Sequence, residues 1–327
     1  MRLGVSGCGA VGMRLARLLA EEQSVSRVLV SDPHAGAARR ASLAAGAKGS
    51  VTDELFASPV DVVVLCGPSG THAEQARKAL ENGIPVVSTA RSSLDVGELL
   101  SLDRLARLAG LPVVVGVGWS PGFSCLLAGA SAESMDRVSE IRVFRAGAAG
   151  ASCARDALSE LTGPAHVWHG GAWSSGFAGW GRELVWLPDP IGAVDTRSAA
   201  AGDVYLLAET FPHARRIEAR VAAGLSRVMA ARLGIGPRRQ RGDGVVAFRI
   251  DVRGREGGRP VHRVFGGLDR GCMATASVAA RVAAAVCRGE AAPGAYGLSS
   301  WAEPRRLLRE LSDAGVRAAV YDPAAVE

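Results

Sequence analysis

The chain lacks the features that mark several large classes of protein. No apolar run reaches the roughly 18 uninterrupted residues that a membrane-spanning helix needs, so we expect no membrane partner. Apolar residues follow Met1-Arg2 as they do in a secretion signal, but glycines and arginines interrupt them, and a strand, turn and helix explain the segment better. No CxxC occurs among the six dispersed cysteines. This excludes a zinc ribbon or a disulfide framework and favours a reducing, cytoplasmic setting.

Lysine is also scarce. Of the 38 basic residues only Lys48 and Lys78 are lysines, and the arginines are scattered. The densest cluster, Arg238-Arg239-Gln240-Arg241, is short. A nucleic-acid surface needs a longer basic stripe or a recognisable module, so the formal net charge of +6 predicts no nucleic-acid partner. His166 and His169 have the spacing of a metal pair, but glycines flank them and no third ligand is evident, so we expect no metal site.

The first 118 residues alternate apolar strand patterns with helical ones, which is typical of a parallel α/β sheet. We predict a Rossmann-type parallel sheet with helices on both faces, in a domain covering residues 1–118. The expected strands are Arg2–Val5, Arg27–Val30, Val60–Cys66, Pro85–Ser88 and Pro112–Val117. The expected helices run from Gly12 to about Glu22, Ala37 to Ala45, Thr71 to Asn82 and Asp95 to Ala109.

After Gly118 the strand candidates become more polar and often alternate. We therefore predict a second α+β domain at residues 119–270, built on a mixed or antiparallel sheet. Gly254 and Gly257-Gly258 separate its last two strands and indicate a hairpin. Residues 271–327 are expected to form C-terminal helices that return to the first domain. The expected strands are Val138–Arg145, Glu183–Leu187, Arg216–Ala222, Gly244–Val252 and Pro260–Phe265.

A glycine-rich turn follows the first strand. Gly7-x-Gly9-x-x-Gly12 leads into a helix with an apolar stripe, which matches the fingerprint of dinucleotide-binding domains. Gly7 allows the tight turn, Gly9 lets the backbone approach phosphate, and Gly12 lets the helix pack on the strand. The N–H groups at the helix start favour an anion. The predicted pyrophosphate contacts are Gly7, Cys8, Gly9, Ala10, Val11 and Gly12.

Asp32 ends the second strand, 20 residues after Gly12, which is the spacing at which an acid meets the adenosine ribose. A carboxylate accepts from the free hydroxyls and repels a 2′-phosphate, so Asp32 favours NAD. Arg39-Arg40 would support NADP if the loop folds back. The sequence therefore predicts NAD or NADP as cofactor, with a slight preference for NAD.

The loop after the central strand is the expected site of the other end of the cofactor. Gly67, Pro68 and Ser69 would lie along its ribose or nicotinamide, since ligands bind at the carboxyl ends of parallel strands. Thr71 is also suited to cap the next helix, with Glu74 completing a capping box. His72 is expected on the surface of that helix.

Gly118-Trp119-Ser120-Pro121-Gly122 leaves the last strand of the first domain. The spacing of Gly118, Ser120 and Gly122 matches the nucleophile elbow of α/β-hydrolases. That elbow needs an N–H after the serine, and Pro121 has none. Ser120 as a helix N-cap before Pro121 explains the same residues.

These motifs together resemble the saccharopine dehydrogenase-like NAD(P)-dependent oxidoreductases, most closely the meso-diaminopimelate dehydrogenases. The resemblance covers about the first 125 residues and includes Val87-Ser88-Thr89. It implies an oxidoreductase that interconverts an amine and an imine or keto compound. The nicotinamide would lie over Gly67–Ser69, near Thr89, with the Trp119 loop facing the substrate. By resemblance, a homodimer would form through the sheet of the second domain.

Two departures from the diaminopimelate dehydrogenases bear on the substrate. Those enzymes carry aspartates where this chain has Ser120 and Arg91. The change disfavours an ammonium group at that place, and an arginine there suits a carboxylate or phosphate. We therefore expect an amino-acid-like or anionic substrate other than diaminopimelate. The second domain adds Arg155 and Asp156 as substrate-side candidates, whereas Cys153 is better explained as an inert buried thiol than as a thiol of lowered pKa.

Two alternatives remain open. A sugar or polyol dehydrogenase of the glucose–fructose oxidoreductase type has a similar Thr71-His72 helix start. That family carries a lysine after the next strand, where this chain has Thr89-Ala90-Arg91. A non-catalytic NAD(P) sensor would bind the cofactor without turnover. The residue that supplies the proton cannot be identified from the sequence.

Overall fold

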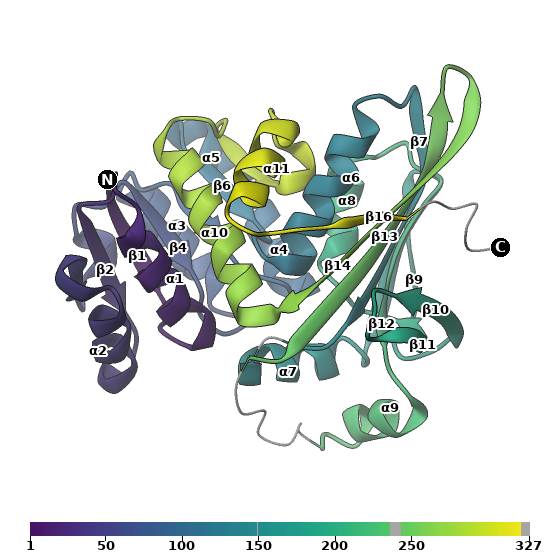
Figure 1. Cartoon of the computed structure of the whole chain (residues 1–327), viewed down its shortest axis with the longest axis horizontal. Helices are drawn as coiled ribbons and strands as arrows, with labels where there is room; N and C mark the ends of the chain where they lie inside the picture. The colour runs from purple at the N-terminus through teal and green to yellow at the C-terminus, as the bar shows by residue number, and fades with distance from the viewer. Residues whose placement is uncertain (149, 236–242, 322–327) are drawn as a thin grey trace.

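Two β-sheets lie side by side in the computed structural model (Figure 1), which describes residues 1–148, 150–235 and 243–321. The arginine cluster at 238–241 lies outside the described residues. Within those residues no helix is long and apolar enough to cross a membrane. All six cysteines are described and are free thiols.

The first sheet is parallel throughout and follows the strand order β15-β6-β5-β4-β1-β2-β3. The run from β3 to β6 is the order of a dinucleotide-binding fold, so the predicted Rossmann-type sheet is confirmed. All four residues of β4 are buried, as expected for a strand covered on both faces. The strands are β1 (Arg2–Ser6), β2 (Arg27–Ser31), β3 (Gly49–Val51), β4 (Val62–Leu65), β5 (Val86–Ser88), β6 (Pro112–Val115) and β15 (Gly294–Gly297).

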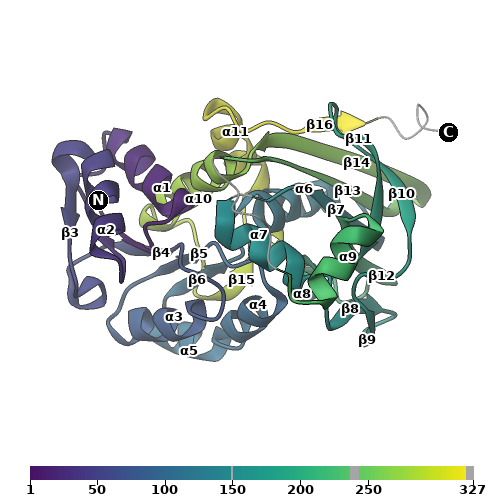
Figure 2. The same ribbon diagram turned by 90° about the horizontal axis from the view of Figure 1, so that it is seen from below.

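Helices cover both faces of this sheet, as Figure 2 shows. One face carries α1 (Ala10–Glu21), α2 (Ala35–Ala44) and α10 (Gly271–Cys287). The other carries α3 (His72–Glu81), α4 (Ser93–Leu100) and α5 (Asp103–Ala109). The prediction of one helix from Asp95 to Ala109 was wrong, because the chain turns at Ser101-Leu102 between α4 and α5. Gly110 ends α5 in the left-handed conformation, with φ of 69°, which glycine adopts without strain.

The second sheet is mixed. Strand β7 pairs in parallel with β12, and the other neighbours pair antiparallel, so the predicted fold class is confirmed. The expected hairpin is β13–β14, with Gly257-Gly258 at its turn. The strands are β7 (Arg137–Ala146), β8 (Pro164–His169), β9 (Ala172–Phe177), β10 (Glu183–Leu187), β11 (Gly192–Ser198), β12 (Arg216–Ala222), β13 (Val245–Glu256), β14 (Arg259–Arg270) and β16 (Ala319–Tyr321).

The two faces of the second sheet differ in chemistry because successive side chains point to opposite sides. The inner face buries apolar residues such as Ile141 and Phe248 against the helices that lie between the sheets. Sequence patterns did not reveal four short helices of this unit. They are α6 (Ser124–Ala132), α7 (Gly150–Ser159), α8 (Asp203–Thr210) and α9 (Leu225–Arg232). Helix α11 (Pro304–Asp313) belongs to the C-terminal residues, where helices were expected.

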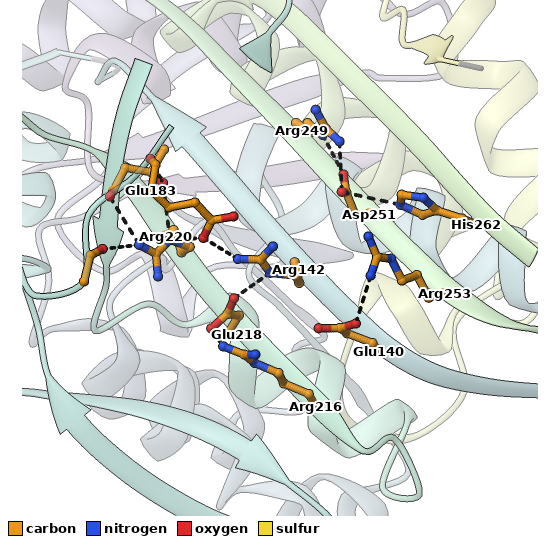
Figure 3. A network of polar contacts seen from close by, with 12 residues as sticks. Glu140, Arg142, Glu183, Arg216, Glu218, Arg220, Arg249, Asp251, Arg253 and His262 are labelled. Atoms are coloured by element: carbon orange, nitrogen blue, oxygen red, sulfur yellow. Dashed lines mark hydrogen bonds and ion pairs between the residues drawn. The ribbon is translucent and has the colours of Figure 1, made fainter. Parts of the chain in front are cut away.

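Alternating charges line the outer face of the second sheet (Figure 3). Arg142 on β7 pairs with Glu218 on β12 at 2.6 Å and with Glu183 on β10 at 2.5 Å. Arg249 and Asp251 of β13 form a further pair at 2.7 Å. Acidic and basic side chains alternate across neighbouring strands, so the face neutralises most of its own charge.

The chain leaves the first unit after β6 and returns to it at α10. Helix α10 packs beside α1, and β15 then adds to the edge of the first sheet next to β6. The last strand, β16, pairs with β14 in the second sheet. The chain therefore connects the two units at three places: after β6, before α10 and before β16.

The helix–strand contact at Gly12 gives a test of the fold. A Cβ on Gly12 would lie 1.9 Å from the Gly7 carbonyl oxygen, whereas a Cβ on Gly97 in α4 would meet its nearest atom at 4.0 Å. We expect Gly12→Ala to lower the free energy of unfolding by more than about 2 kcal/mol, because backbone must shift. Gly97→Ala, the matched control, should raise it by up to about 1 kcal/mol through helix propensity. Urea unfolding measures both; equal effects would contradict the packing role of Gly12.

Candidate functional site

The glycine-rich turn is shaped by close backbone contacts. Gly7 has φ of 90°, and a Cβ there would lie 2.6 Å from the Gly67 nitrogen. Only glycine adopts this conformation without strain. The turn between β1 and α1 therefore presses directly on the loop that follows β4.

Gly9 is not explained by any packing inside the protein. A Cβ on Gly9 would meet no atom of the described residues within 4 Å. The residue precedes α1, whose first N–H groups have no partner within the helix. Its open side faces the cleft described below, where a side chain would keep a ligand away from those N–H groups. The cradle therefore fits a phosphate group of a dinucleotide.

Asp32 is oriented by two backbone groups. Its Oδ2 accepts from the Cys8 N–H at 2.7 Å, and its Oδ1 accepts from the His34 N–H at 2.8 Å. Each carboxylate oxygen keeps a lone pair for a further donor. The carboxylate therefore stands beside the glycine turn with capacity to accept from further donors, and its contact with a ribose stays a prediction.

The loop after β4 is held from three directions. Asp95, fully buried in α4, accepts from the Gly70 N–H at 2.8 Å. The Thr71 hydroxyl donates to the Pro68 carbonyl at 2.8 Å and makes no cap contact, so the predicted capping box is wrong. These contacts fix the shape of the loop before any ligand arrives.

His72 is the third anchor of this loop. Its ring lies 2.8 Å from the Ser88 hydroxyl and 3.0 Å from the Gly67 carbonyl oxygen, so both nitrogens are engaged. The side chain is 2% exposed, and the prediction of a surface position was wrong. Burial lowers the pKa of His72, which keeps the ring neutral at pH 7. His72 therefore supports the loop and does not exchange protons with the cleft.

A cleft of about 410 Å³ runs from the glycine turn to the second unit. Its lining joins the carboxyl ends of β1, β4 and β5 to residues of β7, α7, β13 and α10. Nine predicted cofactor contacts line it: Gly7, Gly9, Ala10, Val11, Asp32, Gly67, Pro68, Ser69 and Thr89. Cys8 and Gly12 do not line the cleft. The Cys8 N–H orients Asp32, and Gly12 lets α1 pack closely against the turn. All five substrate-side candidates also line it: Arg91, Trp119, Ser120, Arg155 and Asp156.

A buried ion-pair cluster forms the wall between the two units. Arg91, just after β5, binds both oxygens of Glu160 at 3.0 to 3.2 Å. Arg145 of β7 contacts the same carboxylate at 2.9 Å and Asp203 of α8 at 3.1 Å. Glu160 is 2% exposed. Glu160 thus engages Nε and Nη2 of Arg91, so a substrate carboxylate would have only the remaining donors of this side chain, and the expected contact stays a prediction.

Ser120 belongs to this cluster too. The Ser120 hydroxyl donates to Asp203 at 2.9 Å and accepts from the Ser124 hydroxyl at 3.0 Å. Helix α6 begins at Ser124, and Pro121 and Gly122 have non-helical dihedrals, so no helix starts directly after Ser120 and the predicted N-cap role is wrong. The Ser120 hydroxyl is engaged within the wall by Asp203 and Ser124, although the residue also borders the cleft.

Two side chains at the cleft carry buried donors without a hydrogen bond. Trp119 is 4% exposed and packs between Phe123 and Phe248, with ring centroids 5.2 and 5.1 Å away. Its Nε1–H and the Nε and Nη2 donors of Arg145 have no hydrogen-bond partner among the described residues, although Nη2 makes the ion pair with Glu160. A buried donor left unpaired is costly, so these groups fit a ligand that brings acceptor oxygens.

Asp156 lies on α7, on the opposite wall from Ser69. The Ser69 side chain is within hydrogen-bonding reach of its carboxylate. Burial raises the pKa of Asp156, while Arg91 and Ser69 partly oppose the rise. Burial also raises the pKa of Cys153, so this thiol stays protonated, as the inert interpretation predicts. Burial raises the pKa of Cys66 to about 12 in the same way.

Several site residues could not be found from sequence. Arg145, Glu160 and Asp203 carry no motif, and they meet Arg91 and Ser120 only in three dimensions. The only local signal is a charged residue ending the buried part of β7, where Arg145 follows Phe144. Asp95 had a weak signal as an acid near a predicted helix start.

Comparison with known proteins agrees with this geometry. Residues 7–118 match the family model for the NAD binding domain of homoserine dehydrogenase. An inositol 2-dehydrogenase of Mycolicibacterium gilvum is 32% identical over 119 residues, which are 35% of this chain. The match spans 34% of the length of that enzyme. The first unit is thus an NAD(P)-binding Rossmann domain of the dehydrogenase type.

Solved structures share the fold over nearly the whole chain. The saccharopine dehydrogenase (L-Glu forming) of Saccharomyces cerevisiae superimposes with a TM-score of 0.74 at 15% identity, covering 98% of this chain and 100% of that one. The diaminopimelate dehydrogenase of C. glutamicum gives a TM-score of 0.53 at 19% identity and covers 97% and 99%. The arrangement of a Rossmann sheet beside a mixed sheet is common to these structures.

Gly9 gives a direct test of the phosphate cradle. We expect Gly9→Val to leave the free energy of unfolding within about 1 kcal/mol of wild type, because its Cβ has open space and the loss of glycine rarely costs more there. The same change should weaken NADH binding at least tenfold, since the side chain blocks the N–H groups of α1. Fluorescence titration and urea unfolding measure the two effects. Undiminished NADH binding would place the phosphates elsewhere.

Proposed function

We propose that this protein is an NAD-preferring oxidoreductase that interconverts an amine and an imine or keto compound. The observation that carries the proposal is the continuous cleft, which connects the glycine turn and Asp32 to a polar chamber walled by Trp119 and Asp156. A dinucleotide and a small substrate would meet end to end in such a cleft. When bound, the cofactor would supply hydride chemistry, and the protein would supply position and protons.

The choice of NAD rests on Asp32. Its carboxylate is held by the Cys8 and His34 N–H groups, and each oxygen can accept a further hydrogen bond. A 2′-phosphate at this place would meet a fixed negative charge, whereas two hydroxyls would find two acceptors. The pyrophosphate would lie on residues 7–12, and the nicotinamide on residues 67–69.

The substrate class is inferred from the charges of the chamber. Arg91, Arg145 and Arg155 face or border it, and they are balanced by Asp156, Glu160 and Asp203. A balanced chamber with unsatisfied donors suits an amino-acid-like molecule better than a polyanion. Two proteins of the same fold, by their names, act on saccharopine and on diaminopimelate, and these names support an amino compound.

Diaminopimelate itself is not the substrate we propose. The aspartates of the diaminopimelate dehydrogenases are replaced by Ser120 and Arg91, and both are tied into the wall through Asp203 and Glu160. No carboxylate at either position is left to hold an ammonium group. The reacting nitrogen must therefore find its partner on another element.

A second candidate is a sugar or polyol dehydrogenase. The match to an inositol 2-dehydrogenase favours it, although that match is confined to about a third of each chain. The chain has no lysine after β5, where Thr89-Ala90-Arg91 stands. The amine reaction therefore remains the first choice.

Pairing of two copies through the second sheet stays a prediction from the resemblance. The outer face that such a dimer would use is the alternating charged face of Figure 3. Charges of both signs on one face can complement a second copy related by a twofold axis.

Cofactor preference tests the first half of the proposal. We expect wild type to bind NADH about tenfold or more tightly than NADPH, because Asp32 repels a 2′-phosphate. Asp32→Asn should narrow this ratio mainly by improving NADPH binding. Asp53→Asn on an exposed loop is the control and should leave the ratio unchanged. Tighter binding of NADPH by wild type would contradict the assignment.

Turnover tests the second half. Purified protein with NADH and ammonium should reduce a member of a panel of 2-oxo acids, and with NAD⁺ it should oxidise the matching amino acid. Neither meso-diaminopimelate nor myo-inositol should be oxidised above background. Absorbance at the NADH band follows each reaction. Oxidation of myo-inositol would establish the second candidate, and NADH binding without turnover of any compound would indicate a sensor.

A further inference from the structure

The described residues lining the cleft offer few groups able to exchange a proton near neutral pH. His72 has both ring nitrogens engaged, and burial lowers its pKa. Burial raises the pKa of Cys66 and of Cys153, so neither thiol ionises readily. Asp32 lies at the adenosine end, away from the substrate chamber, with both oxygens held by backbone N–H groups. Arginines do not deprotonate in proteins.

Asp156 is the remaining candidate, and its position suits the task. It lines the cleft from α7 of the second unit and reaches the Ser69 side chain on the first unit. Ser69 belongs to the loop that Asp95 and His72 hold in place. The carboxylate is therefore set across the cleft from the loop proposed to carry the nicotinamide.

Resting on the proposed function, we propose that the Asp156 carboxylate is the proton acceptor and donor of this site. It exchanges a proton with the nitrogen or oxygen attached to the carbon that is oxidised or reduced. In the oxidative direction the C–H bond breaks, and the hydrogen leaves with both bonding electrons as hydride, which the oxidised dinucleotide would accept. The C=N or C=O bond forms, and the proton of the N–H or O–H goes to an Asp156 oxygen. The reverse direction returns that proton.

The surroundings allow this carboxylate to change its protonation. Arg91 lowers the pKa of Asp156, but its Nε and Nη2 are engaged by Glu160, so this fork of donors does not hold Asp156 permanently ionised. Burial raises the pKa of Asp156 toward the range in which a carboxyl group serves as a general acid. The charged or titratable groups that face it from the elements packed around it are Arg91, Asp95, His72, Cys153 and Glu160.

A binding experiment tests this position without any substrate. An ionised carboxylate beside the nicotinamide attracts the positive ring of NAD⁺ and not the neutral ring of NADH. In wild type the affinity for NAD⁺ relative to NADH should therefore rise with pH as Asp156 ionises. In Asp156→Asn the ratio should fall about tenfold at pH 8 and lose its dependence on pH. Asp195→Asn, which removes a carboxylate of a surface pair on β11, should behave as wild type.

Turnover and stability complete the test. Asp156→Asn should lower kcat at least 100-fold and remove the limb of the pH profile that belongs to the carboxyl group, and Asp156→Glu should restore part of kcat. An acid with a raised pKa stabilises the fold at low pH and loses that contribution as pH rises through its folded value. The Tm of Asp156→Asn at pH 8 should therefore equal or exceed that of wild type.

The outcomes separate this inference from the proposed function. If wild type binds neither NAD⁺ nor NADH, both fail together. If wild type binds and turns over while Asp156→Asn keeps the wild-type ratio and kcat, only the role of Asp156 is overturned. If Asp156→Asn does not fold, the same comparison made with Asp156→Ser, which also lacks the carboxylate, decides: an unchanged ratio and pH profile would overturn the role.

Discussion

The carboxylate of Glu160 lies between two guanidinium groups, and this contact joins the two halves of the molecule. Arg91 comes from the first unit and Arg145 from the second, and both are largely buried. Removal of one partner from such a buried set leaves a charge without compensation, at a cost of about 3–5 kcal/mol. The wall of the cleft therefore depends on these groups being in place together. Asp203 and Ser120 extend the same network to the loop that carries Trp119.

The cofactor end of the cleft is also held in place by contacts within the protein, but these contacts are hydrogen bonds to backbone groups. There, backbone N–H groups and buried side chains hold the site before a ligand binds. Asp32 is oriented by two amides, and the Gly70 amide is held by Asp95. Groups arranged in advance lose little entropy when a ligand arrives. In contrast, Gly9 contributes by having no side chain at all.

The parts of the structure predicted from sequence are those encoded over short distances. The turn from Gly7 to Gly12 and the apolar β4 have local signatures, and the first sheet follows from them. The wall of the cleft has none: Arg91 meets Glu160 across 69 positions, and Ser120 meets Asp203 across 83. Without those partners, Arg91 looked available to a substrate. The prediction that His72 lies on the surface failed because its hydrogen-bond partners could not be foreseen. Ser88 and the Gly67 carbonyl satisfy both ring nitrogens, so the side chain can be buried.

The return of the chain to the first sheet has a mechanical consequence. The polypeptide crosses between the units at Gly118-Trp119 and again at Gly271, and all three residues border the cleft. It crosses a third time between α11 and β16, which pairs with β14 in the second sheet. Three covalent crossings, together with the ion pairs of Glu160, restrict rotation of one unit against the other. We therefore expect the two walls of the cleft to keep nearly the same spacing with and without a bound molecule.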